Sequence, residues 1–203
     1  MPKPLSEPKI QEFRDQFCDA ATRLFAERGA AGVSIRDLAA AVGVSAMTPY
    51  RYFTDKDEIL AAVRARAFDR FADALETAHR TSGDSLEKMR SAGRAYVRFA
   101  FAESAAYRLM FDTAQPGEER YPDLLRAGTR ARATMTRHID ALIADGILEG
   151  DPVAIGHVMW ATLHGAIMLK MAGKLTTDCR FEQIVEDSFS MFLTAFAAKD
   201  SPR

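Results

Sequence analysis

The stretch from Ser34 to Lys56 constrains the fold of this chain more than any other. Ser34 is a favoured N-cap residue, and the apolar residues after it recur with the period of one buried helical face: Ile35, Leu38, Ala39 and Val42. Gly43 can take the left-handed conformation that ends a helix. Ser45 is a second N-cap, from which we expect a short helix over Ala46–Tyr52. This order, helix, Gly-containing turn, helix, is typical of a helix-turn-helix unit, whose second helix enters the DNA major groove.

The expected second helix carries groups that bond phosphate oxygens or base edges. These groups are the hydroxyls of Thr48, Tyr50 and Tyr52 and the guanidinium of Arg51. Pro49 lies only four residues past the cap and removes at most one backbone hydrogen bond there, so we expect the helix to accommodate it. A third helix is expected from Asp55, and Lys56 would point a cation toward a phosphate.

The segment Ala20–Leu60 resembles the DNA-binding domain of TetR-type transcriptional regulators. It contains LF-x-x-x-G, IRDLA-x-x-x-GVS and YRYF-x-x-K in the order and spacing of that family. The resemblance implies that Arg36 reaches a base edge, that Thr48 and Tyr50 contact a base or the backbone, and that Tyr52 and Lys56 hold phosphates. The candidate DNA-contacting residues are Ser34, Arg36, Met47, Thr48, Tyr50, Arg51, Tyr52 and Lys56.

The charge of the chain limits how it could bind DNA. The formal net charge is −1, and residues 1–60 hold eight Lys and Arg against nine Asp and Glu. Broad electrostatic attraction therefore cannot supply the affinity, which must come from a few placed cations, helix N-termini, hydroxyls and the pairing of two subunits.

Several other classes of protein are disfavoured. Cys18 and Cys179 lie far apart in the sequence, as expected of reduced cysteines in a cytosolic protein. The N-terminal residues are polar and rich in Pro, and we see no apolar run near the roughly 20 residues of a membrane span, so we expect a soluble, cytoplasmic protein without membrane contact. His157 and His164 have no carboxylate or thiol at metal-ligand spacing, and no cofactor motif is present, so neither a metal nor a cofactor is expected.

The chain is expected to be all-α, with about nine helices. These are expected over 9–28, 35–42, 46–52, 55–78, 85–103, 105–111, 123–145, 152–172 and 181–197. The clearest break is Thr81–Asp84. We therefore expect an N-terminal three-helix helix-turn-helix domain over 1–56, a connecting helix over 57–80, and a C-terminal helical domain for ligand binding and dimerisation over 81–203.

The last two expected helices carry more apolar surface than one face can hold. The helix that begins at Asp151-Pro152 is apolar almost all round, and the final helix is rich in Phe. Surplus apolar surface on two adjacent helices predicts a homodimer with a four-helix contact. A two-fold dimer also suits a palindrome with half-sites about 34–36 Å apart. The candidate interface residues are Ile155, Met159, Leu163, Ile184, Phe189, Phe192 and Phe196.

A second resemblance concerns the C-terminal domain. Trp160–Gly165 is similar to the W-x-x-x-HG motif of one class of TetR-type C-terminal domains, and Tyr107–Phe111 is similar to a segment that those domains carry. The resemblance implies a small-molecule pocket. Its candidate lining residues are Phe99, Tyr107, Met110, Trp160, His164 and Met168. Many Met and Phe residues after residue 84 would also suit an adaptable pocket, although an ordinary helical core has the same composition.

Three functions remain open from the sequence. The first is a dimeric DNA-binding transcriptional regulator, most commonly a repressor that a small-molecule effector releases from a palindromic operator. The second is a small α-helical enzyme, which lacks support because we find no G-x-S-x-G, P-loop or metal-spaced cluster. The third is a helix-turn-helix that contacts protein and has no DNA target.

Overall fold

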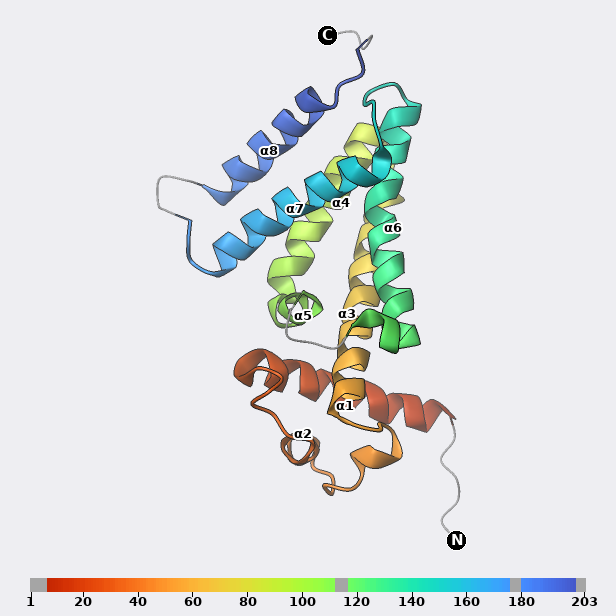
Figure 1. The fold of residues 1–203 in the computed structure, drawn as a ribbon, viewed down its shortest axis with the longest axis vertical. Coiled ribbons are helices and arrows are strands. Elements are labelled where there is room, and N and C mark those ends of the chain that lie inside the picture. The colour runs from red at the N-terminus through yellow and green to blue at the C-terminus, as the bar shows by residue number, and fades with distance from the viewer. Residues whose placement is uncertain (1–6, 112–116, 176–179, 200–203) are drawn as a thin grey trace. The chain divides into compact units, whose positions relative to one another are not determined.

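The computed structural model describes residues 7–111, 117–175 and 180–199 (Figure 1). Among them are eight α-helices and two short 3-10 helices, so the all-α prediction is confirmed. The α-helices are α1 (Glu7–Arg28), α2 (Ile35–Val42), α3 (Lys56–His79), α4 (Ser85–Ala102), α5 (Ser104–Met110), α6 (Pro122–Ala144), α7 (Pro152–Met171) and α8 (Phe181–Ala195). The 3-10 helices are η1 (Pro49–Arg51) and η2 (Glu118–Arg120). Cys179 and the first six residues lie outside the described residues.

The helices gather into two compact units. The first comprises residues 1–72 and 101–130, and the second comprises residues 73–100 and 131–203. These units do not coincide with the predicted domains over 1–56, 57–80 and 81–203, which stay a prediction. Helix α5 belongs to the first unit because it packs on α1.

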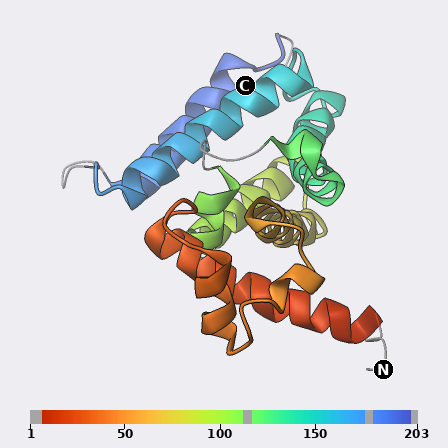
Figure 2. The ribbon, with the colours of Figure 1, turned by 60° about the horizontal axis from the view of Figure 1, so that its bottom comes forward.

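The core of the first unit fixes the helix-turn-helix. It joins apolar side chains from α1, α2, the start of α3 and α5: Phe17, Phe25, Leu38, Phe53, Ile59 and Leu109 among others. Helix α1 ends where Gly29 takes a left-handed φ of 72°. Figure 2 brings α1 and α2 to the front of the view. The predicted apolar face of α2 is confirmed, since Leu38 is buried in this core and Ile35 and Val42 pack against it.

The core of the second unit lies among α4, α6, α7 and α8. Its buried residues are Met89, Ile139, Leu142, Leu148, Ile155 and Phe192. Asp151 caps α7 as predicted, since its carboxylate accepts a hydrogen bond from the Val153 backbone N–H at 3.1 Å. The end of α8 is tied to the α6–α7 connection, because the Glu149 N–H donates to the Phe196 carbonyl at 2.9 Å.

The predicted α-helix over Ala46–Tyr52 is wrong. Residues 46–48 form a turn, and residues 49–51 form the 3-10 helix η1. Proline has no N–H, and in an α-helix its ring would collide with the carbonyl four residues earlier, which here belongs to Ser45. The Thr48 N–H donates to the Ser45 carbonyl instead, at 2.9 Å. The Tyr52 N–H then donates to the Pro49 carbonyl at 2.9 Å, which is a hydrogen bond of the 3-10 type.

Helix α7 is as apolar as expected, and it is little buried. It has 20 residues and a mean hydropathy of 1.3 over its best 18-residue window, of which only 22% is buried. By length and composition it is therefore a candidate membrane span, contrary to the expectation that the chain has none. One such helix is weak evidence, since core helices of soluble proteins have the same length and composition.

Candidate DNA interface and ligand cavity

The start of α2 is held by a capping box. The Ser34 hydroxyl accepts from the Asp37 N–H at 3.2 Å, and the Asp37 carboxylate accepts from the Ser34 N–H at 2.9 Å and from the hydroxyl at 2.6 Å. The Ser34 hydroxyl bond lowers the pKa of Asp37, followed by the backbone bond. Ser34 is thus engaged in the cap. Arg36, two residues on, is exposed and has no ion pair with a described residue.

The turn and η1 present three side chains to solvent. Met47 is 70% exposed and Tyr50 is 52% exposed, both unusual for large apolar or aromatic groups, and Arg51 is exposed beside them. Thr48 is half-buried, and its hydroxyl lies 2.9 Å from that of Ser45. Pro49 is buried beneath this surface, so it anchors η1 to the core.

Two predicted phosphate-binding residues brace the unit. The Tyr52 ring stacks on Phe13 at 4.2 Å between centroids, and the Lys56 ammonium donates to the Ala30 carbonyl at 2.9 Å. The hydroxyl of Tyr52 and the two remaining N–H groups of Lys56 are the groups left for DNA.

Sequence reasoning missed Arg14. Its guanidinium donates to the Tyr52 carbonyl and lies 4.3 Å above the Phe53 ring. It also lies 3.8 Å from the Glu58 carboxylate. Arg14 therefore fixes the end of η1, and no local pattern signals this role because its partners lie about forty residues away in the sequence.

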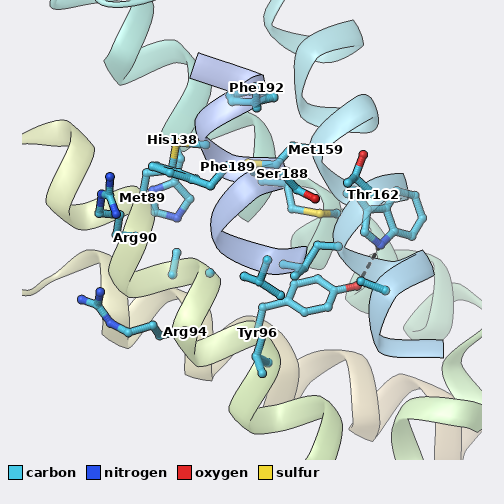
Figure 3. Close-up of a pocket in the computed structure, with 18 of the residues that line it drawn as sticks. Met89, Arg90, Arg94, Tyr96, His138, Met159, Thr162, Ser188, Phe189 and Phe192 are labelled. Atoms are coloured by element: carbon cyan, nitrogen blue, oxygen red, sulfur yellow. Dashed lines mark hydrogen bonds between the residues drawn. The ribbon is translucent and has the colours of Figure 1, made fainter. Parts of the chain in front are cut away.

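The second unit contains a cavity of about 740 Å³, partly open to solvent. Its wall comes mainly from α4, α6, α7 and α8 (Figure 3). Most of the lining is apolar, including Met89, Val97, Met159, Leu163, Phe189 and Phe192. A concave, mainly apolar cavity with a few polar groups is the usual form of a small-molecule site.

The cavity wall also carries polar side chains: Arg90, Arg94, Arg98, Thr134, His138, Thr162, Glu182, Glu186 and Ser188, besides Tyr96 and Trp160. The Trp160 indole N–H donates to the Tyr96 hydroxyl at 3.0 Å. The Arg90 guanidinium lies 4.4 Å from the centre of the Phe189 ring and 3.7 Å from Glu186. His138, on α6, is only 4% exposed.

Of the six predicted pocket residues, Trp160 lines this cavity and the others lie elsewhere. Tyr107 and Met110 are buried in the first unit, and Phe99 is buried on α4. His164 is half-buried with its ring 6.3 Å from that of Trp160, and burial lowers its pKa. Met168 is 36% exposed.

The seven predicted interface residues differ in their exposure, and the interface stays a prediction. Ile155 is 2% exposed and lies in the core, so it has no surface left for a partner. Five others line the cavity: Met159, Leu163, Phe189, Phe192 and Phe196. Ile184 is half-buried. The exposed large apolar residues of α7 and α8 are different ones: Val153, Val158, Met168, Leu169 and Met191.

Sequence reasoning also missed His138. The buried face of α6 repeats every three or four residues through Leu124, Ala127, Ala131, Thr134, His138 and Leu142. That spacing places His138 in the middle of an apolar stripe, and this was the available signal.

No three His, Cys, Asp or Glu side chains gather at metal-binding distance within the described ranges.

Two family profiles match the chain. The one described as "Bacterial regulatory proteins, tetR family" matches residues 17–63, and the one described as "Tetracyclin repressor-like, C-terminal domain" matches residues 89–196. The chain is similar over 97% of its length to a protein with unknown function from Rhodococcus sp. RHA1, with 26% identity, 99% coverage of that structure and a TM-score of 0.79.

Curated relatives agree with these profiles. The HTH-type transcriptional activator FasR of Mycolicibacterium smegmatis is 30% identical over 120 residues, which are 59% of this chain and 55% of FasR. The HTH-type transcriptional repressor ComR of Escherichia coli is 40% identical over 70 residues, 34% of this chain and 33% of ComR. Both alignments span less than two thirds of the relative's own length. These relatives are transcriptional regulators and not enzymes, and the C-terminal profile alone covers more than half of the sequence, so this chain belongs to the TetR family of bacterial transcriptional regulators.

Proposed function

We propose that this regulator binds a palindromic operator as a homodimer in the cytoplasm, and that a small molecule in the cavity of the second unit releases it. The observation that carries the proposal is the pairing of two features in one chain. A braced helix-turn-helix exposes Arg36, Met47, Tyr50 and Arg51, and a separate unit holds a cavity of about 740 Å³.

On the DNA side, the exposed residues take different roles. Arg36 follows the N-cap of α2, where the helix dipole and free N–H groups also favour a phosphate or base edge. Tyr50 and Met47 reach bases, and Thr48 and Arg51 contact bases or phosphates. Ser34, Tyr52 and Lys56 hold the duplex in register while they brace the protein.

The proposed dimer uses the exposed side of α7. Val153, Val158, Met168 and Leu169 are each more than a third exposed on this one helix, and Met191 on α8 is 71% exposed. A second copy that covers them would explain why so apolar a helix is so little buried. Val158 and Met191 also line the cavity, so the partner subunit would help to enclose the ligand.

The sense of regulation is proposed as repression with release. A ligand that binds more tightly to the form of the dimer whose subunit spacing does not fit two half-sites shifts the protein toward that form. The operator affinity then falls by a factor set by the ligand's differential affinity for the two forms. One relative is named an activator and another a repressor, so both senses occur among relatives.

The test is selection of bound fragments from the source genome, followed by titration of the selected operator against random duplex. We expect selective binding by a dimer and its loss in Tyr50→Ala. Binding that prefers no sequence would overturn the proposal. Cellular function that survives both Arg36→Ala and Tyr50→Ala would instead favour a helix-turn-helix that contacts protein.

A further inference from the structure

His138 occupies an unusual position in the cavity wall. Its side chain is only 4% exposed. Figure 3 shows it beside Met89 and Phe189, with Thr162 at the right of the view and Tyr96 at the bottom. Its Nδ1 lies 3.2 Å from the Nδ1 of His79. None of the described residues hydrogen-bonds its Nε2, and with Nδ1 turned to His79, Nε2 is the ring nitrogen left for the cavity that His138 lines.

The imidazole of His138 is neutral at pH 7. Burial, followed by the nearby His79 and Arg137, lowers its pKa from 6.5 to about 4. A neutral imidazole has one donor and one acceptor, and the pair with His79 decides which is which. When His79 donates between the two Nδ1 atoms, His138 Nε2 carries a proton and donates. When His138 donates, its Nε2 accepts.

Within the part of the chain that the structure describes, no buried cation accompanies His138. Arg90, Arg94 and Arg98 also line the cavity, but all three are exposed residues of α4, and Arg90 pairs with Glu186. The neighbours of His138 in the lining are apolar side chains such as Met89 and Phe189. A carboxylate buried beside the neutral His138 would be desolvated, while the described cations of the wall are exposed, so this position disfavours a carboxylate. An uncharged oxygen needs only one hydrogen bond.

We propose that the effector is a largely apolar molecule with a hydroxyl or carbonyl oxygen, and that His138 Nε2 binds this oxygen. The inference rests on the proposed function in treating the cavity as the effector site. It adds the chemical class of the ligand and the residue that recognises it. His79 acts as a positioning residue, because its bond to Nδ1 sets whether Nε2 donates to a carbonyl or accepts from a hydroxyl.

The single tryptophan of the chain is a built-in reporter. Trp160 lines the cavity and donates to Tyr96, so a ligand that enters will change its fluorescence. The probes are 1-decanol, 2-undecanone and decanoate, titrated into the full-length protein at pH 7. We expect the alcohol and the ketone to bind more tightly than decanoate. His138→Phe should weaken the alcohol and the ketone by about 10-fold, the worth of one hydrogen bond, and leave decanoate unchanged.

Two controls keep the test decisive. His157→Phe replaces an exposed histidine of α7 and should leave all three affinities unchanged. If His138→Phe does not fold, as judged by circular dichroism, His138→Gln replaces it and should retain part of the affinity through its amide. In the wild type, the ¹⁵N resonance of His138 Nε2 should shift with decanol, which a merely structural histidine would not show.

Some results would overturn the inference. Tightest binding of decanoate, weakened by Arg94→Gln and indifferent to His138→Phe, would assign an anionic ligand held at the rim. No response of Trp160 to any probe would also contradict it. Operator binding is measured separately. If the protein binds decanol through His138 but prefers no DNA sequence, only the regulatory proposal is refuted. If the protein binds its operator selectively and a ligand releases it, but His138→Phe does not change the ligand's affinity, only the ligand assignment is refuted.

Discussion

The DNA-facing surface and the cavity differ in how their residues are brought together. The surface is assembled from one continuous stretch, in which Ser34 caps α2 and Gly43, at a φ of 75°, ends it. The cavity wall is assembled from four helices, and the Trp160–Tyr96 bond joins residues 64 positions apart. Local rules therefore predict the first site well, whereas the second depends on packing that no short pattern specifies.

The same contrast appears within the fold prediction. The expected helices other than 46–52 are confirmed within about two residues at each end, because caps, prolines and glycines act on their own neighbours. The failure at Pro49 has a local cause. Besides the one missing hydrogen bond, a regular α-helix would bring the proline ring into collision with the Ser45 carbonyl.

The cavity and interface residues could not be separated by composition. Both sides of α7 are apolar, so periodicity alone does not tell Ile155, which is buried, from Leu169, which is 49% exposed. Likewise, Tyr107 and Met110 fall within the expected C-terminal domain over 81–203, yet they pack within the first unit. Only tertiary contacts decide these cases.

The largest expected effect tests the two sides of the α7–α8 pair. Phe192→Glu places a charge in the core of the second unit and should prevent stable folding, since even Phe→Ala in a core costs about 3–5 kcal/mol. Leu169→Glu should leave a folded monomer. Circular dichroism and light scattering distinguish these outcomes. A folded Phe192→Glu monomer together with a dimeric Leu169→Glu variant would restore the interface expected from sequence.

The next effect tests whether His138 is buried in its neutral form in the cavity wall. As the pH falls from 6.5 toward 4, the unfolded chain protonates residue 138 while the folded chain does not, so the free energy of unfolding falls with pH. The His138 contribution to this loss is about 3 kcal/mol. His138→Gln should flatten the slope in that window, as measured by urea denaturation, whereas the exposed-site control His157→Gln should not. Equal slopes in wild type and His138→Gln would show that the histidine is not buried in its neutral form.

A smaller effect tests the DNA surface. Arg36→Ala should relax the preference at one base position by about 1–3 kcal/mol, because a guanidinium bond to a base edge is lost. Lys56→Ala and Tyr52→Phe should instead weaken binding to all duplexes alike, and Lys56→Ala should reduce the salt slope by about 1. Operator variants titrated at several salt concentrations separate these roles. Unchanged selectivity and salt dependence in all three variants would contradict them.

The smallest effect concerns the α2 cap. Ser34→Ala removes the hydroxyl that accepts the Asp37 N–H, at a cost of about 1 kcal/mol in the free energy of unfolding. Ser34→Asp, which also caps, should recover most of that loss. Thermal denaturation measures both. If Ser34→Ala is as stable as the wild type, the cap does not support the helix.

Pro49 has a consequence for how an operator can be read. Because the ring lacks an N–H and would collide with the Ser45 carbonyl, a regular α-helix cannot run without interruption from Ser45 through Pro49 to Tyr52. In a 3-10 helix, side chains three positions apart eclipse one another, whereas in an α-helix they are offset by about 60°. The side chains of Thr48 and Arg51 therefore lie on the same side of η1. We therefore expect a residue-to-base code taken from a relative with a regular helix at this place to be out of phase with the one that this protein uses.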